Sequence, residues 1–378
     1  MPYRDVLIVG GGPAGSTLAW ALRQQGRSVA IIDKEQFPRD KVCAGWITPA
    51  VLQSLQFDTD EYSQENILQP IHGFRMGRIS GNSNDINYPD GPVSYSIRRC
   101  EFDHYLLQRS DADVYPETKF ETASYANGLW TVNESFSTPL LVGAGGHFCP
   151  VARQLGAKLG KAEVAVSAQE IEFLMTEKQQ RECQVASDKP EIFFCDDLKG
   201  YGWVVRKGSY LNIGLGREDN AYLGEHVSSF CEKLRKLHRI PDDIPEKFRG
   251  HAYLQYPHAK RKLFDDGVLL IGDAAGLAYL RSGEGIRPAI ESALLAAQVI
   301  RNSGCNYDKD ILSSYQDQLE AQFGQRIAAT NVNPMLTAVQ VSLGKLLLDT
   351  CWFDRYVVLN HWFLHQQQPP VTLDKNLH

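Results

Sequence analysis

The fold is decided by a stretch near the N-terminus, Asp5-Val6-Leu7-Ile8-Val9-Gly10-Gly11-Gly12-Pro13-Ala14-Gly15. In it a short apolar run, typical of a buried strand, leads directly into a glycine cluster. A helix-compatible segment, Ala14–Gln25, follows, and after a break at Gly26 a second apolar run ends in Asp33. Strand, helix and strand in this order predict one βαβ unit.

The glycines follow the spacing G-x-G-x-x-G, with Gly10, Gly12 and Gly15 at the three positions. The first permits a tight turn, the second lets the backbone approach a pyrophosphate, and the third lets helix and strand pack closely. The N–H groups and partial positive charge of the helix N-terminus favour phosphate binding. Asp33 is placed to accept hydrogen bonds from the hydroxyls of a ribose. The unit therefore predicts a dinucleotide site.

Length and composition are typical of a globular enzyme with two interleaved domains. The chain has 378 residues, of which 43% are hydrophobic and 22% charged, and 39 basic and 45 acidic side chains give a net charge of −6. This balance does not favour nucleic-acid binding. The eight cysteines form no C-x-x-C pair, which argues against a zinc site and a disulfide framework. With no room for a targeting peptide before Val6 and no long apolar run, we expect a cytoplasmic protein.

A second glycine turn follows another apolar strand late in the chain. Val268–Ile271 leads into Gly272-Asp273-Ala274-Ala275-Gly276. Further on, Ser282–Pro288 carries two more glycines and precedes a helix of small and aliphatic residues, Ala289–Ile300. A proline suits the first turn of such a helix, whose bare N–H groups would face a ligand.

The remaining segments predict an α/β fold class with two domains. Short alternating segments over residues 56–97 and 163–256, interrupted by a helix over Glu225–His238, are typical of an antiparallel sheet. We therefore predict a Rossmann-like nucleotide-binding domain interleaved with an α+β substrate domain and followed by C-terminal helices. The expected bounds are 1–55, 98–160 and 257–310 for the nucleotide domain, 56–97 and 161–256 for the substrate domain, and 311–378 for the helical segment.

Further motifs, in order along the whole chain, complete a resemblance to a known family. They are Lys41-Val42-Cys43-Ala44-Gly45, Arg99 with Phe102-Asp103, the pair Tyr201–Val205 and Leu211–Gly214, and Gly283-Glu284-Gly285-Ile286. With both glycine turns they resemble flavoproteins of the glutathione reductase and p-hydroxybenzoate hydroxylase type, and within them the geranylgeranyl reductase family. The resemblance implies FAD as cofactor and a hydrophobic, isoprenoid-like substrate whose carbon–carbon double bonds are reduced by hydride from the flavin.

The resemblance also implies which residues contact FAD. We expect contacts from Gly10, Gly12, Pro13, Ala14, Gly15, Asp33, Lys34, Lys41, Cys43, Ala44, Gly45, Arg99, Gly272, Asp273, Gly283, Gly285 and Ile286. The loop around Cys43 is expected beside the isoalloxazine ring, and the loop from Gly283 under its pyrimidine edge. No metal is implied.

Cys43 is the candidate acid, because reduction of a double bond needs a proton as well as a hydride. Tyr201 and Trp203, with Trp46, are expected to form apolar walls that position the substrate and exclude water. A buried cysteine that only fills space is the alternative for Cys43. Glu284 can be either a flavin neighbour or a structural glutamate.

One motif departs from the family. Relatives usually carry Gly-Ala-Asp-Gly after the middle strand, whereas this chain reads Gly143-Ala144-Gly145-Gly146. In hydroxylases the acid helps to hold FAD and the nicotinamide donor, so its replacement puts direct use of NADPH in doubt. The external electron donor (NADPH, ferredoxin or another reductant) stays open.

Two other functions remain. The same fingerprints serve flavin-dependent monooxygenases and halogenases, which act on aromatic substrates, and Phe37-Pro38-Arg39 resembles halogenases, although their Trp-x-Trp-x-Ile-Pro stretch is missing. A non-catalytic, redox-responsive flavoprotein at a membrane surface is the third, favoured by Gly145 and by the apolar segments Met335–Leu348 and Trp352–Leu364. We expect these segments to pack on the substrate domain, with peripheral contact at the inner membrane face as the alternative.

Overall fold

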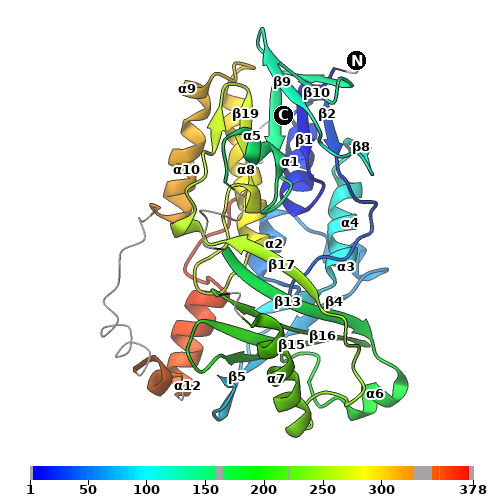
Figure 1. Cartoon of the computed structure of the whole chain (residues 1–378), viewed down its shortest axis with the longest axis vertical. Coiled ribbons are helices and arrows are strands. Elements are labelled where there is room, and N and C mark those ends of the chain that lie inside the picture. Colours follow the sequence, from blue (N-terminus) through cyan, green and yellow to red (C-terminus); the bar gives the residue numbers. More distant parts are fainter. Residues whose placement is uncertain (1–2, 159–164, 220–221, 327–342, 349, 374–378) are drawn as a thin grey trace.

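The computed structural model describes residues 3–158, 165–219, 222–326, 343–348 and 350–373. Two large sheets organise these residues, a six-stranded sheet in the upper half of Figure 1 and a seven-stranded sheet in the lower half. The predicted α/β class with a Rossmann-like domain and a second, α+β part is confirmed. The domain bounds given above stay a prediction.

The six-stranded sheet carries the predicted βαβ unit. Its order is β18-β19-β12-β1-β2-β8, and all its pairs are parallel except β18 with β19. Strand β1 is buried throughout, as expected for a parallel strand covered on both faces. The strands are β1 (Val6–Val9), β2 (Val29–Ile32), β8 (Asp113–Tyr115), β12 (Leu140–Gly143), β18 (Phe264–Asp265) and β19 (Val268–Leu270).

Three helices pack beside this sheet and form the largest core. Helix α1 (Pro13–Gln24) contacts both α4 (Arg99–Arg109) and α8 (Ile286–Asn302). Small residues make the close approach between α1 and α8 feasible, since α8 buries a run of alanines. The first turns of α1 and α8, which both follow glycine turns, therefore lie near one another.

The seven-stranded sheet has the order β17-β13-β16-β15-β14-β5-β6. It differs from the predicted antiparallel sheet in one pair, because β5 and β14 run parallel with Arg75 opposite Glu191. These two strands are far apart in the sequence, so no hairpin dictates their direction. The strands are β5 (Gly73–Arg78), β6 (Ser83–Asn87), β13 (Ala165–Leu174), β14 (Glu191–Phe194), β15 (Gly200–Lys207), β16 (Tyr210–Arg217) and β17 (Arg249–Leu254).

Two smaller sheets connect these parts. Residues 56–97 do not form one inserted sheet as predicted, because β7 (Ser94–Ile97) pairs with both β4 (Leu68–Ile71) and β3 (Trp46–Ile47) in a separate sheet, whereas β5 and β6 join the seven-stranded sheet. A hairpin turns at Asn127-Gly128, and both residues have the positive φ that a tight hairpin turn requires. This turn joins β9 (Ala123–Ala126) to β10 (Leu129–Val132), and β11 (Phe136–Thr138) pairs with β10 as the third strand of the sheet.

The remaining elements are short helices. Helix α7 (Leu223–Lys236) packs on β13 and β16. Near the C-terminus, α12 (Cys351–Phe353) continues into the π-helix η3 (Asp354–Phe363), as predicted for this segment, whereas most of the predicted helix Met335–Leu348 lies outside the described residues. The others are α2 (Pro49–Ser54), α3 (Thr59–Ser63), α5 (Pro150–Gln154), α6 (Glu177–Glu182), α9 (Lys309–Leu312), α10 (Ser314–Phe323), and the 3-10 turns η1 (Tyr256–His258) and η2 (Gly272–Ala274). Within the described part of the chain we find no helix with the length and apolarity to span a bilayer.

Candidate active site

A large cleft lies between the two main sheets, with a volume of about 2730 Å³ that includes space open to solvent. Its wall combines the turn after β1, the loop Arg39–Trp46, strands β15 and β17, and the loop before α8. Every residue predicted to bind FAD or to take part in catalysis lines this cleft, except Gly15 and Gly272. Their individual roles stay predictions, but the structure brings their side chains together.

The glycine turn after β1 is shaped as a cradle for a pyrophosphate. Gly10 has φ +115°, and a Cβ there would lie 2.5 Å from the carbonyl oxygen of Ala144 in the adjacent turn. A Cβ on Gly15 would lie 1.9 Å from the carbonyl oxygen of Gly10, so this glycine shapes the turn without lining the cleft. No side chain caps α1 at Gly12, which leaves the N–H groups and positive end of the helix for an anionic ligand. The residues present therefore fit the diphosphate of FAD.

Asp33 ends β2 at the edge of this cradle. Its two carboxylate oxygens accept hydrogen bonds from the backbone N–H groups of Gly11 at 2.7 Å and Glu35 at 2.9 Å. These bonds orient the carboxylate and leave further lone pairs for the hydroxyls of a ribose. The neighbouring Lys34 also lines the cleft.

Two arginines converge on one buried carboxylate beside the cradle. Arg99 binds Asp103 through two parallel hydrogen bonds of 2.7 and 2.8 Å, and Arg39 lies 3.3 Å from the same carboxylate. Because two cations share one anion, this corner of the cleft is net positive, which suits a phosphate. A Cβ on Gly12 would touch only the guanidinium of Arg39, at 3.4 Å. Sequence reasoning missed Arg39, although its position after Phe37-Pro38 was visible as a halogenase-like signal.

A second charged group surrounds Asp273 in η2. The imidazole of His251, on β17, lies 3.7 Å from the Asp273 carboxylate, and the Lys41 ammonium lies 3.0 Å from a ring nitrogen of His251. Burial lowers the pKa of Lys41 to about 8 although Asp273 opposes the shift, and burial also lowers the pKa of His251. Burial pushes the pKa of Asp273 upward, but the hydrogen bond from His251 and the charge of Lys41 hold it below its usual range. His251 carried no sequence signal because it reaches the cleft only through the sheet pairing of β17.

The loop around Cys43 is clamped onto the seven-stranded sheet. The backbone N–H of Cys43 donates to the Glu170 carboxyl on β13, and Asn212 on β16 donates to the Cys43 carbonyl at 3.1 Å. The thiol itself accepts a bond from the Gly45 N–H at 3.3 Å. Burial raises the pKa of Glu170 to about 7, although the bond from Cys43 opposes the shift. Hydrogen bonds with two strands of the sheet therefore hold this loop, and one of them ends on the carboxyl group whose pKa burial raises.

Aromatic side chains form the adjoining wall. Trp203 lies over Gly214, where a Cβ would approach its ring to 2.2 Å, and its indole N–H donates to Asn212 at 2.8 Å. The Tyr201 hydroxyl donates to the carbonyl of Ser282. Phe363, which comes from η3, lies 5.2 Å from the Tyr201 ring and also lines the cleft. Sequence reasoning found the two residues of β15 but missed this contribution from the C-terminal segment.

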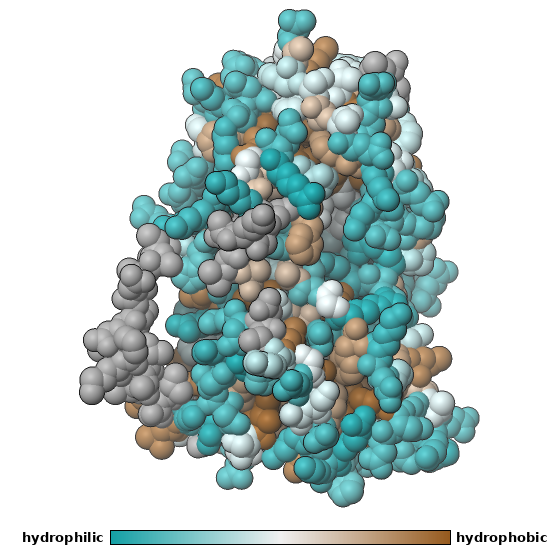
Figure 2. All heavy atoms as spheres, in the orientation of Figure 1, coloured by the Kyte–Doolittle hydropathy of each residue, from teal (hydrophilic) through white to brown (hydrophobic). Residues whose placement is uncertain are grey.

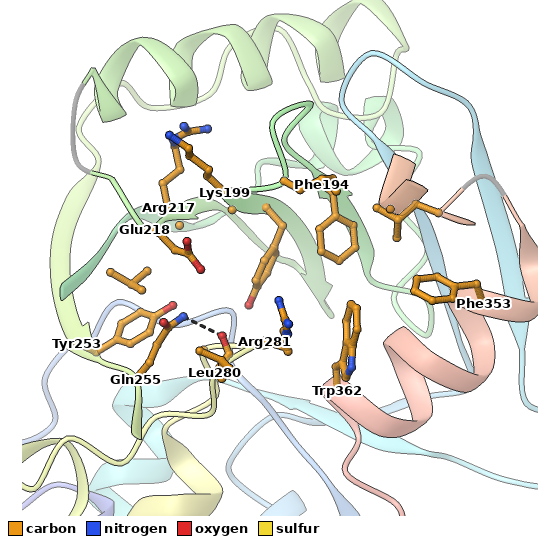
Figure 3. Close-up of a pocket in the computed structure, with 18 residues that line it drawn as sticks. Phe194, Lys199, Arg217, Glu218, Tyr253, Gln255, Leu280, Arg281, Phe353 and Trp362 are labelled. Carbon is orange, nitrogen blue, oxygen red and sulfur yellow. Dashed lines mark hydrogen bonds between the residues drawn. The ribbon is translucent and has the colours of Figure 1, made fainter. Parts of the chain in front are cut away.

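A smaller cavity of about 760 Å³ adjoins the cleft and shares Tyr201, Gly216, Tyr253 and Gly283 with it. Figure 3 shows aromatic rings, among them those of Phe194, Phe353 and Trp362, around one side of it. Lys199, Arg217 and Glu218 lie on the other side, whereas the Arg281 guanidinium lies beside Trp362, 5.4 Å from its ring centroid. The apolar space around Tyr201 thus continues from the cleft toward the C-terminal helices.

The start of α8 completes the cleft. Gly285 is the N-cap residue of the helix and no side chain caps it, so its first N–H groups are available to a ligand. Gly283, with φ +66°, packs against Tyr253, whose hydroxyl would lie 2.1 Å from an added Cβ. Ile286 and Ala289 also line the cleft. This is the second helix N-terminus, after that of α1, that opens on the same space.

Comparisons with known proteins agree with this geometry. The FAD dependent oxidoreductase family matches residues 5–85. An uncharacterised protein of Methanosarcina barkeri is 30% identical over 319 residues, covering 80% of this chain and 76% of the relative. The digeranylgeranylglycerophospholipid reductase of Methanocaldococcus jannaschii is 27% identical, covering 78% of this chain and 76% of the relative.

Solved structures share the fold at low sequence identity. A geranylgeranyl bacteriochlorophyll reductase-like protein from Thermoplasma acidophilum has a TM-score of 0.72 and 21% identity, over 92% of this chain and 88% of the other. A variant of the halogenase PltM in complex with FAD has a TM-score of 0.68 and 16% identity, over 92% and 76%. The chain therefore belongs to the geranylgeranyl reductase family of FAD-dependent oxidoreductases, with FAD as its cofactor.

Proposed function

We propose that the chain reduces carbon–carbon double bonds of a hydrophobic, isoprenoid-like substrate. The observation that carries this proposal is the aromatic, apolar space around Tyr201 and Phe363, which opens directly from the cradle suited to FAD. A relative named as a digeranylgeranylglycerophospholipid reductase supports the same substrate class. An isolated double bond offers no polar group for recognition. An apolar wall can instead bind a hydrocarbon substrate by its shape and keep water away from it.

Reduced FAD, held by the residues of the glycine cradle, would supply the hydride chemistry for such a reduction. We propose that Cys43 delivers the proton to a carbon of the double bond, directly or through a water beside it. The hydrogen bonds of Glu170 and Asn212 with the Cys43 backbone hold the thiol in place. The rings of Trp46, Tyr201 and Trp203 position the substrate and keep water out. The FAD contacts predicted above, including Asp33, Lys41 and Asp273, belong to this proposal.

The electron donor and a membrane contact are further parts of the proposal. We infer a donor other than NADPH, because Gly145 stands where an acid would help to hold a nicotinamide. We also propose that the exposed side chains Leu343, Leu346, Trp352 and Tyr356 touch a membrane that supplies a lipid substrate. Figure 1 places α12 at the lower left of the molecule, and Figure 2 shows some apolar residues there among polar ones.

A flavin-dependent monooxygenase or halogenase is the second candidate, favoured by the structural similarity to PltM. The two functions differ in their need for oxygen. We expect the photoreduced protein, mixed with a geranylgeranyl lipid without oxygen, to yield a product heavier by two hydrogens. Product formation only in the presence of oxygen, with added oxygen or halogen in the mass spectrum, would support the second candidate instead.

A further inference from the structure

The C-terminal end of η3 lies directly behind the aromatic wall of the cleft. Phe363, its last residue, is only 1% exposed, and its ring centroid lies 5.2 Å from that of Tyr201 and 6.2 Å from that of Trp46. The Tyr201 and Trp46 side chains both line the cleft. Phe363 therefore acts on a bound substrate mainly through the two rings in front of it, whose positions depend on where η3 ends.

The body of η3 is fixed on the seven-stranded sheet. Asn84, on β6, donates to the Asp354 carboxylate at 3.0 Å, and the Tyr88 hydroxyl donates to the Asn360 side chain at 2.6 Å. Both contacts come from the edge strand β6 and the residue just after it. They fix η3 as far as Asn360 and leave its last residues to other contacts.

The chain that follows η3 is fixed on α8 instead. Arg287, in the first turn of α8, is only 1% exposed, and its guanidinium donates to the backbone carbonyls of His365 at 3.2 Å, Gln368 at 2.7 Å and Pro369 at 3.2 Å. The same guanidinium donates to the Glu291 carboxylate at 2.8 Å. Because the acceptors are backbone carbonyls, this clamp holds the path of the chain and not its side chains.

His365 makes the turn between η3 and this clamp. Its φ of +45° lies in the left-handed region, which costs a non-glycine residue free energy and persists only where the surroundings hold it. Phe363 lies two residues earlier in the chain. The contacts that hold His365 therefore decide how firmly the end of η3 is placed.

Tyr279 supplies the side-chain part of this anchor. It lies in the loop between η2 and α8, where its carbonyl accepts from the Gly283 N–H and its N–H donates to the Glu284 carbonyl, each at 3.0 Å. Its ring is stacked on the His365 imidazole, with 3.7 Å between the ring centroids and 26° between the planes. Its hydroxyl donates to the Gln368 side chain at 2.8 Å. The turn after η3 is thus tied to the loop that leads into α8.

The imidazole of His365 serves here as an aromatic ring. The residue is 8% exposed, and its Nε2 atom has no hydrogen-bond partner in the part of the chain that the structure describes. Burial, helped by the charge of Arg287, lowers the pKa of His365 to about 3, so the ring is neutral at pH 7. It also lines neither of the two cavities. Stacking on Tyr279 is the contact through which this side chain acts.

We propose that His365 is a positioning residue, which fixes the end of η3 by stacking on Tyr279. A loosened turn would free the Phe363 ring to leave its place behind the aromatic wall. The proposal rests on the proposed function, because that wall is assigned to a hydrophobic substrate. Its structural claim concerns η3 itself and can be measured without any substrate.

The first test measures backbone hydrogen exchange over residues 354–363 in the FAD-loaded full chain, for the wild type, His365→Ala and His365→Phe. Both variants keep a Cβ at the same φ, so they differ in the ring alone. Loss of the ring in His365→Ala should speed exchange about tenfold, whereas His365→Phe, which loses only an unpartnered nitrogen, should exchange like the wild type. Gln316→Ala, at an exposed position of α10, is the control. Wild-type exchange in His365→Ala, or equal acceleration in both variants, would overturn the proposal.

The second test asks whether this position matters to the reaction, by measuring KM and kcat for a geranylgeranyl lipid in the same variants. The wall contacts the substrate before and during the reaction, so His365→Ala should raise KM about fivefold and leave kcat within about twofold of the wild type. His365→Phe should restore the KM of the wild type. A KM that stays unchanged in His365→Ala would refute a positioning role. If the wild type reduces no such lipid, the proposed function fails, and the exchange rates still decide whether His365 positions η3.

Discussion

The glycine cradle at α1 and the wall around Cys43 line the same cleft, yet the chain builds them in different ways. The cradle comes from one continuous βαβ unit that ends at Asp33. The wall joins Cys43 to Asn212 on β16 and to Phe363 on η3, which are distant in the sequence. Backbone contacts hold the cradle, whereas side-chain hydrogen bonds and ring packing hold the wall. We therefore expect one substitution in the cradle to abolish FAD binding. A substitution in the wall should lower activity or stability while FAD stays bound.

The largest effect is expected from Gly15→Ala. The added Cβ would meet the carbonyl oxygen of Gly10 at 1.9 Å, so α1 must move away from β1, at a cost of about 1–3 kcal/mol. We expect purified protein to lose most of its flavin absorbance. Gly224→Ala on α7 is the control, since nothing lies within 4 Å of a Cβ there. A normal flavin content in Gly15→Ala would show that the cradle accommodates the added methyl group and that FAD binding does not depend on the close approach of α1 to β1.

The wall is probed next by Cys43→Ala and Cys43→Ser. If the thiol delivers the proton, turnover should fall about 100-fold or more while flavin content stays normal. The measurement is single-turnover reduction of a geranylgeranyl lipid by the prereduced protein. Full turnover in both variants would remove Cys43 from the mechanism and leave it as a packing residue.

The stability of the wall should depend on pH through Glu170. Its pKa is raised from the usual 4.5 to about 7 in the folded chain, so the unfolded chain releases this proton first as pH rises. The free energy of unfolding should therefore fall between about pH 4.5 and 7, by roughly 2–3 kcal/mol from this group alone.

Denaturant unfolding at pH 5 and pH 8 measures this change. Glu170→Gln, which keeps an acceptor for the Cys43 N–H, should lose less stability over that interval than the wild type. Glu177→Gln on α6 is the control, because its side chain is 91% exposed. Equal losses in the wild type and Glu170→Gln would mean that the clamp on Cys43 does not titrate in this range.

The smallest effect is expected from two exposed aromatic residues near the C-terminus, Trp352 and Tyr356. Trp352→Ser with Tyr356→Ser should weaken binding to zwitterionic phospholipid vesicles roughly tenfold, because two aromatic side chains no longer enter the interface. Flotation of vesicles with bound protein measures it. Leu174→Ser serves as control, as Leu174 is 61% exposed on β13. Unchanged flotation of the double variant would separate this segment from any membrane contact.

Much of the site could be predicted because its parts lie next to one another in the sequence. The turns at Gly10 and Gly272 each follow a buried strand, so spacing alone located them. Arg39 and His251 could not be found in this way. Each reaches the cleft through a loop or a sheet pairing. Arg39 belongs to the halogenase-like stretch Phe37-Pro38-Arg39, but nothing in that stretch indicates its contact with Asp103, and His251 carries no motif at all.

The sequence by itself determined the βαβ unit, the second glycine turn and the presence of a sheet over residues 163–256, because backbone geometry depends on neighbours a few positions apart. Only the tertiary structure decided that β5 pairs in parallel with β14, that Phe363 closes the aromatic wall, and that His251 lies 3.7 Å from the Asp273 carboxylate. Burial and pairing are properties of the space around a side chain. The residues that surround a side chain come from segments far away in the sequence, so a short stretch of sequence cannot reveal them.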